Sequence, residues 1–140
     1  MTGATLNGSN LYRATFAGAT LRDGWIQHVV AVGTPFTEVD FVGANLYGSK
    51  FQSASFVRAN LTGVAFTKCN LDHAYFLNAR LHRVRFEDTS LNGTDFSEAD
   101  LTNADLRGLD LRSCRGLTAE QVAKAFTNAS TQLPADMLAQ

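Results

Sequence analysis

Large apolar residues recur at every fifth position from Leu6 to Leu111. Of the 22 positions in this register, 20 are Leu or Phe, and the other two are Ile26 and Ala31. The residue two positions before each large one is usually small, most often Ala. A period of five fits neither an α-helix, with about 3.6 residues per turn, nor a β-strand, with about two. The pattern therefore predicts a chain that turns a corner every five residues.

The position directly before each large residue is often Asn or Asp, whose side chains hydrogen-bond nearby backbone in turns. The complete repeat reads Ala, then Asn, Asp, Thr or Ser, then Leu or Phe, then two variable residues, as at 44–48, 59–63 and 104–108. This repeat resembles that of the pentapeptide repeat family, and the resemblance extends from residue 4 to about residue 114. It implies an all-β fold, a right-handed, four-sided (quadrilateral) β-helix solenoid with four pentapeptides, or 20 residues, in each coil.

Elementary packing leads to the same kind of fold. A single pentapeptide cannot bury its own Leu or Phe, so stacked coils must share one continuous core. A period of 20 places five phenylalanines on one side of that core, and offset stacking of their rings is favourable. We therefore expect a ladder of stacked rings formed by Phe16, Phe36, Phe56, Phe76 and Phe96.

The repeat is weakest between residues 24 and 35, where Ala31 fills the centre poorly and Gly33 and Pro35 interrupt the sequence. This stretch is either an irregular coil or a loop whose length is a multiple of five. The irregular coil is the favoured interpretation, because a ten-residue loop would move Phe16 off the side that carries the other phenylalanines.

The repeat gives way to a different pattern near the C-terminus. Thr118 and Gln121 have the spacing of a capping box, and Leu117 and Val122 have that of a hydrophobic staple. These signals predict a short C-terminal capping α-helix over residues 118–128. We expect its apolar face, formed by residues 122 and 126, to lie across the last coil.

The chain accordingly divides into a pentapeptide repeat β-helix, residues 1–116, and a C-terminal capping helix and tail, residues 117–140. No comparable cap precedes the first coil. Either that coil meets another copy of the chain or the natural chain is longer, and self-association is the favoured interpretation. The sequence thus predicts a head-to-head homodimer through the N-terminal coils.

Several apolar side chains fall on outward positions of the predicted coils, where a cluster can mark an interface. Trp and Tyr are favoured anchors in protein interfaces. The alternative is that the side chains of residues 24–35 fold over the end of the solenoid itself. The candidate interface residues are Tyr12, Trp25, Val30, Val32, Tyr47, Val57, Tyr75 and Leu77.

Nothing in the sequence indicates catalysis. His28, His73 and His82 fall on outward positions without a nucleophile beside them, and no phosphate-binding loop or metal-ligand spacing occurs. Cys69 and Cys114 fall on inward small-residue positions, which favours buried thiols over a disulfide or a metal pair. We expect a protein that is not an enzyme and has no catalytic residue, cofactor or metal.

The N-terminal residues lack the apolar run of a signal peptide, and no stretch approaches the roughly 18 apolar residues of a membrane span. This predicts a cytoplasmic protein without membrane contact. The net charge is −1, but its sign varies along the chain: residues 50–85 carry +5 and residues 86–110 carry −6. The separation is either an ordinary solvated surface or an axial polarity that orients a partner.

The leading functional hypothesis is a non-catalytic protein-interaction or scaffold module, whose partner is another protein of unknown identity. The alternative comes from the family resemblance: some pentapeptide repeat proteins mimic B-DNA, bind DNA gyrase and protect this topoisomerase from quinolones. The charge argues against that alternative. A rod of about 26 Å would need on the order of 15 negative charges to match duplex DNA, and this chain carries −1. We expect no direct binding of nucleic acid.

Overall fold

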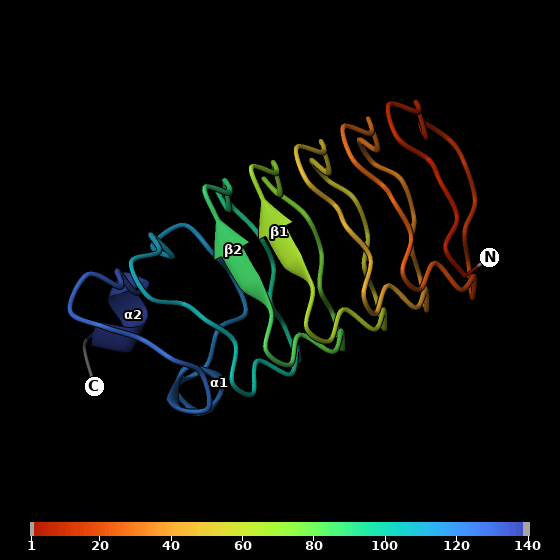
Figure 1. The fold of residues 1–140 in the computed structure, drawn as a ribbon. Helices are drawn as coiled ribbons and strands as arrows, with labels where there is room; N and C mark the ends of the chain where they lie inside the picture. Colours follow the sequence, from red (N-terminus) through yellow and green to blue (C-terminus); the bar gives the residue numbers. More distant parts are fainter. Residues whose placement is uncertain (1, 139–140) are drawn as a thin grey trace.

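The computed structural model describes residues 2–138, which wind into a β-helical solenoid with its two ends at opposite ends of the stack (Figure 1). The bridges between successive coils are parallel. From Thr5↔Trp25 to Asp95↔Arg115, each bridge joins residues 20 positions apart. One coil therefore contains 20 residues, which confirms the predicted period and a β-helix of stacked coils.

The bridges form four columns, each of which we name after one of its residues. The Trp column contains Trp25, the Lys column Lys50, the Pro column Pro35, and the Asp column Asp40. Columns ten residues apart, such as Trp and Pro, are half a coil apart. Phenylalanines from these two columns meet in the core, where the rings of Phe56 and Phe66 lie 6.0 Å apart, so the two columns face each other across it.

Regular secondary structure is short because the chain turns every five residues. Within the described residues, the strands are β1 (Ala65–Thr67) and β2 (Arg85–Glu87), which pair in parallel with Phe66 opposite Phe86. Two helices follow the coils, α1 (Ala119–Ala123) and α2 (Ala135–Leu138). No helix of the described chain is both long and apolar enough to cross a membrane.

The corners are closed by one recurring hydrogen bond. The N–H three residues after a central residue donates to that residue's carbonyl, as from Ser9 to Leu6 over 3.0 Å. Asn or Asp before the centre supports the same turn, since Oδ1 of Asn45 accepts from the N–H of Tyr47 over 3.1 Å. The corner role predicted for these side chains is confirmed. The residue two after each central residue from Leu6 to Leu106 adopts positive φ, from Gly8 to Gly108.

The central side chains fill the core as predicted. In the ladder on the Pro column, successive ring centroids are 5.3, 5.3, 5.1 and 5.4 Å apart from Phe16 to Phe96, and all four pairs are stacked. A second stacked pair, Phe66 and Phe86, lies on the Trp column at 5.7 Å. The predicted ladder is confirmed.

Polar groups at the inward small positions are also satisfied. The Ser49 hydroxyl donates to the carbonyl of Ile26 over 2.8 Å, and the Thr34 hydroxyl donates to that of Leu11 over 3.0 Å. In both cases the acceptor is the central residue 23 positions earlier, in the previous coil. Ser and Thr can therefore replace Ala at this position without leaving a buried hydroxyl unpaired.

Residues 24–35 form a coil in register rather than a loop. Trp25, Val30 and Pro35 bridge to the coil that follows, and Ala31 is fully buried. Phe51, one coil after Ala31, makes an edge contact of 5.9 Å with Phe36 of Ala31's own coil.

The C-terminal helix is shorter than predicted. The capping box of Thr118 and Gln121 is present, but α1 ends at Ala123 instead of residue 128. Phe126 is extended and bridges to Asp105, with its side chain 55% exposed instead of lying across the last coil. The reason is that the last coil offers unpaired backbone groups. Phe126 receives a hydrogen bond from the N–H of Leu106 and donates one to Ala104, both over 2.8 Å, which requires extended chain.

Candidate functional site

A cleft with a volume of about 630 Å³ lies between α1 and the coil before it. Polar side chains that line it form hydrogen bonds and an ion pair within the protein. The Gln121 amide donates to the carbonyls of Phe96 and Ala99 over 2.8 and 2.9 Å, and Lys124 pairs with Glu120 over 2.9 Å. The cleft therefore marks the contact by which Gln121 of α1 attaches the helix to the solenoid.

Asp100, which also lines this cleft, has a pKa lowered from its ordinary 3.8 to about 2. The largest cause is the hydrogen bond donated by the hydroxyl of Thr102, and His82 on the preceding coil also donates to the carboxylate. Both partners stabilise the ionised form. The group is therefore a structural carboxylate, held charged, and is poorly suited to accept a proton near neutral pH.

The other candidates for chemistry are dispersed. His28 and His73 are exposed at corners, with φ of 54° and 59°. Cys69 and Cys114 are buried, and burial raises the pKa of their thiols to about 11 and about 12. The Cys69 thiol donates to the carbonyl of Leu46 over 3.0 Å, in the manner of Ser49. Both cysteines are protonated inward-facing residues, as the sequence indicated.

The predicted interface residues do not form one surface. Five of them lie on the first three coils, in the Trp and Lys columns or at the corners beside these columns. Tyr12 is 60% exposed and Trp25 is 53% exposed, which leaves large aromatic surfaces in contact with solvent. We call this group the N-terminal patch: Tyr12, Trp25, Val30, Val32 and Tyr47.

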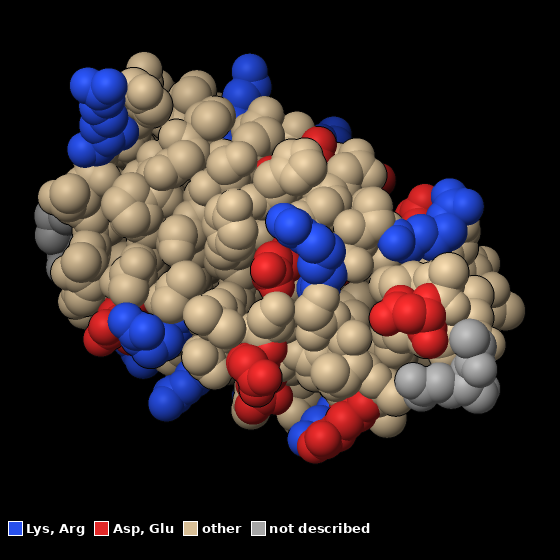
Figure 2. All heavy atoms as spheres, turned by 180° about the vertical axis from the view of Figure 1, so that it is seen from behind, with Lys and Arg blue, Asp and Glu red and all other residues tan. Residues whose placement is uncertain are grey.

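The other three residues lie on the opposite side of the solenoid. Val57 and Leu77 occupy equivalent positions one coil apart, two residues after Ser55 and Tyr75 of the Pro column. The Pro column and the position two residues after it carry no Lys, Arg, Asp or Glu at residues 15–17, 35–37, 55–57 and 75–77. A broad uncharged area near the N-terminal coils is visible from behind (Figure 2).

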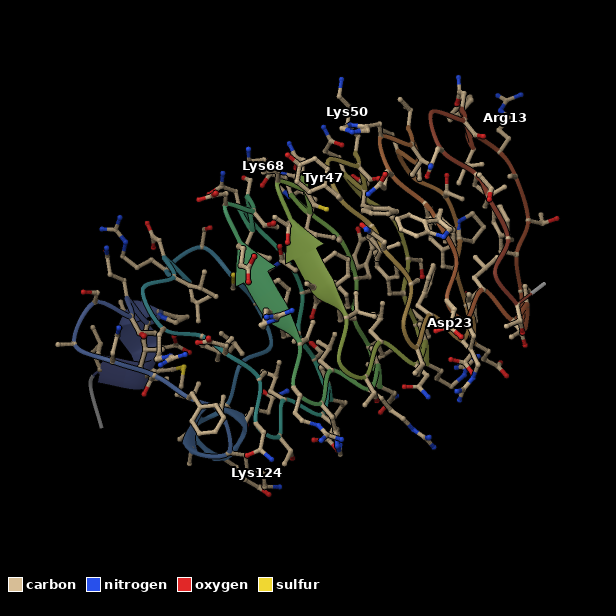
Figure 3. The ribbon with its side chains drawn as sticks, viewed as in Figure 1. Arg13, Asp23, Tyr47, Lys50, Lys68 and Lys124 are labelled. Carbon is tan, nitrogen blue, oxygen red and sulfur yellow. The ribbon has the colours of Figure 1, made fainter. Side chains whose placement is uncertain are left out.

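Cations beside the N-terminal patch were missed as candidates. Arg13, Lys50 and Lys68 project from one edge of the solenoid together with Tyr47 (Figure 3). The Arg13 guanidinium lies 5.3 Å from the ring centroid of Tyr12, and the Lys68 ammonium lies 5.7 Å from that of Tyr47. The sequence signal for this group is the period of 20, which brings these outward residues to one side of the solenoid just as it aligns the core residues.

The axial separation of charge is weakened by ion pairs within and between coils. Arg58 pairs with Glu38 of the preceding coil over 3.0 Å, and Arg85 lies 3.7 Å from Glu87. These pairs are exposed, so each contributes little to stability, but they neutralise much of the local field.

The first coil presents unpaired backbone groups. Thr5, Asn10, Thr15 and Thr20 are the residues whose N–H and C=O would pair with a preceding coil, and these groups form no backbone hydrogen bond within the described residues. Leu6 and Phe16 are only partly buried there, whereas the last central residue, Leu111, is fully buried. The N-terminal end of the described coils is thus an open β-edge over partly exposed core.

Comparisons with known proteins place this architecture. A family model for a pentapeptide repeat region matches residues 48–115, and a model of pentapeptide repeats in eight copies matches residues 1–30. A search of curated proteins found no match.

Similar solved structures include Rfr23, a pentapeptide repeat protein from the cyanobacterium Cyanothece 51142. It has a TM-score of 0.56 and 20% identity, and the overlap covers 84% of this chain and 89% of Rfr23. A pentapeptide repeat protein from the Arabidopsis thaliana thylakoid lumen has a TM-score of 0.51 and 23% identity, with 98% and 88% covered. QnrB1, a plasmid-mediated fluoroquinolone resistance protein, overlaps less well, with a TM-score of 0.44, 16% identity, and 83% and 67% covered. At these identities the likeness concerns the fold.

Proposed function

The chain belongs to the pentapeptide repeat family, and from this premise we propose that it is a non-catalytic interaction module that binds another protein through the outside of its solenoid. The observation that carries the proposal is the N-terminal patch, with Trp25 and Tyr12 more than half exposed on a regular backbone. Trp and Tyr are the residues that most often dominate binding energy in protein interfaces. A preformed surface also loses little conformational entropy on binding.

We further infer that the solenoid is right-handed and four-sided, with residues 1–116 as the repeat unit and 117–140 as its C-terminal cap. Four bridge columns and four corners in each 20-residue coil support the four sides. The hydrogen bonds of the last coil to Phe126 and Gln132 support the role of the cap. We place the protein in the cytoplasm, since two free thiols suit a reducing compartment.

A second copy of the chain is one partner that we propose, at the open N-terminal edge. Each of the four edge residues presents both an N–H and a C=O. Residues that face each other in an antiparallel hydrogen-bonded pair exchange both bonds. A two-fold axis across the end would place Thr5 and Thr15 opposite their own copies, and Asn10 opposite Thr20. All eight edge groups of each copy would then be paired.

The gyrase-binding alternative has less support. A DNA mimic needs rows of negative charge along its length, since duplex DNA carries about one charge per 1.7 Å. The Asp column instead alternates in sign, with Asp40, Arg80 and Asp100 in successive charged positions. The Lys column and its two adjoining corners carry Arg13, Lys50 and Lys68 in the first four coils and no acid before Asp72. This charge distribution favours a protein partner other than gyrase.

Site-specific photocrosslinking in the native host tests the proposal. A photoreactive phenylalanine analogue replaces Trp25 in one variant and Arg85 in a control variant. Arg85 occupies the equivalent position of the same column, three coils away. We expect one discrete crosslinked protein from position 25 and none from position 85, followed by binding of that purified protein to the wild-type chain. Equal or absent crosslinking from both positions would contradict a specific interface at the patch.

A further inference from the structure

The Lys-column side of the first four coils carries cations without compensating acids. Arg13, Lys50 and Lys68 form no ion pair with any described residue. Between residues 7 and 71, the Lys column and its two adjoining corners contain no Asp or Glu. The first acid on this side is Asp72, and it accepts hydrogen bonds from Ser90 and Asn92. The positive charge on this side is therefore available to a partner.

Aromatic rings support two of these cations at the surface. The contacts of Arg13 with Tyr12 and of Lys68 with Tyr47 are cation–π interactions, which favour particular positions of otherwise flexible side chains. His28 packs edge-on against the same Tyr47 ring at 5.4 Å. The charged groups thus have less conformational freedom to lose on binding than isolated surface lysines.

Apolar residues lie between the cations. Val30 bridges directly to Lys50, and Val32 occupies the corner one coil after Tyr12. Both valines are exposed. A ligand seated on this side would meet positive charge at its edges and aliphatic surface at its centre.

We propose that this basic side binds an acidic, apolar-containing segment of a protein partner, extended along the solenoid axis. The inference rests on the proposed function and adds to it the chemistry of the partner. Coil spacing of about 4.8 Å places Lys68 about 5 Å and Arg13 about 9 Å from Lys50 along the axis. Same-face side chains of an extended peptide lie about 6.7 Å apart, and those four residues apart lie about 13 Å apart. Acids four residues apart therefore reach Arg13 at one end and Lys68 with Lys50 at the other, while the apolar residue between them lies toward Val30 and Val32. Val30 and Val32 favour a peptide over nucleic acid, because aliphatic side chains can pack on them and phosphodiesters cannot.

The test uses fluorescence anisotropy with the full chain. The probe is a labelled peptide of about twelve residues in which pairs of Glu alternate with pairs of Leu, so that both faces carry both residue types when it is extended. One control peptide has Lys in place of Glu, and a labelled oligothymidine of similar length probes nucleic acid. One variant combines Lys50→Glu and Lys68→Glu. Its matched control combines Arg80→Glu and Arg83→Glu, which changes the charge equally at exposed cations that lie off the basic side and form no ion pair within the described residues.

We expect the wild type to bind the acidic peptide and neither control probe as tightly. The Lys50/Lys68 variant should weaken that binding at least about tenfold, and the Arg80/Arg83 variant less than about twofold. Equal weakening by both variants would overturn the proposal, because net charge alone would then explain binding. Tighter binding of the oligothymidine would also overturn it. If the peptide does not bind but the photoreactive residue at position 25 still crosslinks one protein, this inference fails and the proposed function stands. If the peptide does not bind and position 25 crosslinks no specific protein, both this inference and the proposed function are contradicted.

Discussion

At each corner of the solenoid, one residue holds a left-handed backbone conformation that side chains other than Gly disfavour by about 1–2 kcal/mol. Within residues 2–138, thirteen non-glycine residues adopt it, among them Arg13, His28 and Lys68. The cost is offset because each corner is joined to the next coil: the N–H of His28 donates to Tyr47 over 2.9 Å. These corner residues project outward, so the conformation that closes the coil also presents the cations and histidines of the surface.

At the same scale, the Phe ladder contributes several of the largest fully buried side chains of the core. Phe56 is fully buried and stacks on Phe36 and Phe76 at 5.3 and 5.1 Å. We expect Phe56→Ala to lower the free energy of unfolding by about 3–5 kcal/mol, since it leaves a cavity that the coils cannot close. Denaturant unfolding measures this, with Phe126→Ala, at an exposed phenylalanine, as the control. A loss below about 1 kcal/mol at Phe56 would show that the ladder is not a core.

The Asp100 carboxylate gives a prediction that depends on pH. Because its pKa falls from 3.8 to about 2 on folding, the ionised group stabilises the fold above about pH 4. That contribution is lost as the pH falls through about 2. Thr102→Val removes the largest cause of the shift, so we expect the Asp100 pKa to rise toward 3.8 in an NMR titration of the side-chain carboxyl. The matched change Thr62→Val, whose hydroxyl donates to the uncharged Asn60, should leave the Asp100 pKa unchanged. An unaltered pKa in Thr102→Val would contradict the assignment.

At the scale of elements, the junction between the last coil and α1 requires a glycine. Gly116 has φ of +75°, and a Cβ there would lie 2.5 Å from the backbone N and 2.7 Å from Cα of Ser97. Gly108 has a similar φ of +72° but open space around it. We expect Gly108→Ala to cost about 1 kcal/mol from its backbone conformation alone, and Gly116→Ala to cost about 1–3 kcal/mol more. Thermal unfolding of the two variants compares them directly. Equal costs would show that the chain does not approach Ser97 closely.

The repeat region was predictable from sequence because each position has one recurring task. Phe36 and Phe56 must fill the core, and Asn45 must close a corner, so the residue types repeat with the period of the coil. The path after Thr118 was predictable only in part. The capping box fixes where α1 begins, but the end of α1 depends on backbone groups of residues 104–106 that capture Phe126. Helical periodicity carries no information about such a distant hydrogen-bond partner.

At the scale of the whole molecule, the open first coil predicts self-association. We expect light scattering at micromolar concentration to give about twice the chain mass, and the N–H groups of Asn10 and Thr15 to become protected from hydrogen exchange. The double variant Asn10→Pro, Thr15→Pro removes two of the edge donors. It should be monomeric yet folded, because Pro35 already occupies the position of Thr15 one coil later. A wild type that remains monomeric throughout this range would contradict the dimer.

The candidate surface was foreseen only in outline. Sequence reasoning found exposed Trp25 and Tyr12 because they interrupt a pattern of small polar outward residues. It placed Tyr75 and Leu77 on the side of the Phe ladder, and Tyr75 does bridge to Ser55 and Asp95 in the Pro column there. Outward positions follow the same period of 20 as inward ones, but surface side chains tolerate many residue types. Their grouping therefore becomes apparent only when each column is followed along the coils.

The central claim is that this protein acts through the surface of its N-terminal coils. Its most direct test is a calorimetric titration of the protein captured at position 25, after purification, with the wild type, Trp25→Ala and Arg85→Ala. We predict that Trp25→Ala weakens binding at least about tenfold without lowering the melting temperature, while Arg85→Ala binds as the wild type does. Equal affinity of all three proteins would contradict the claim.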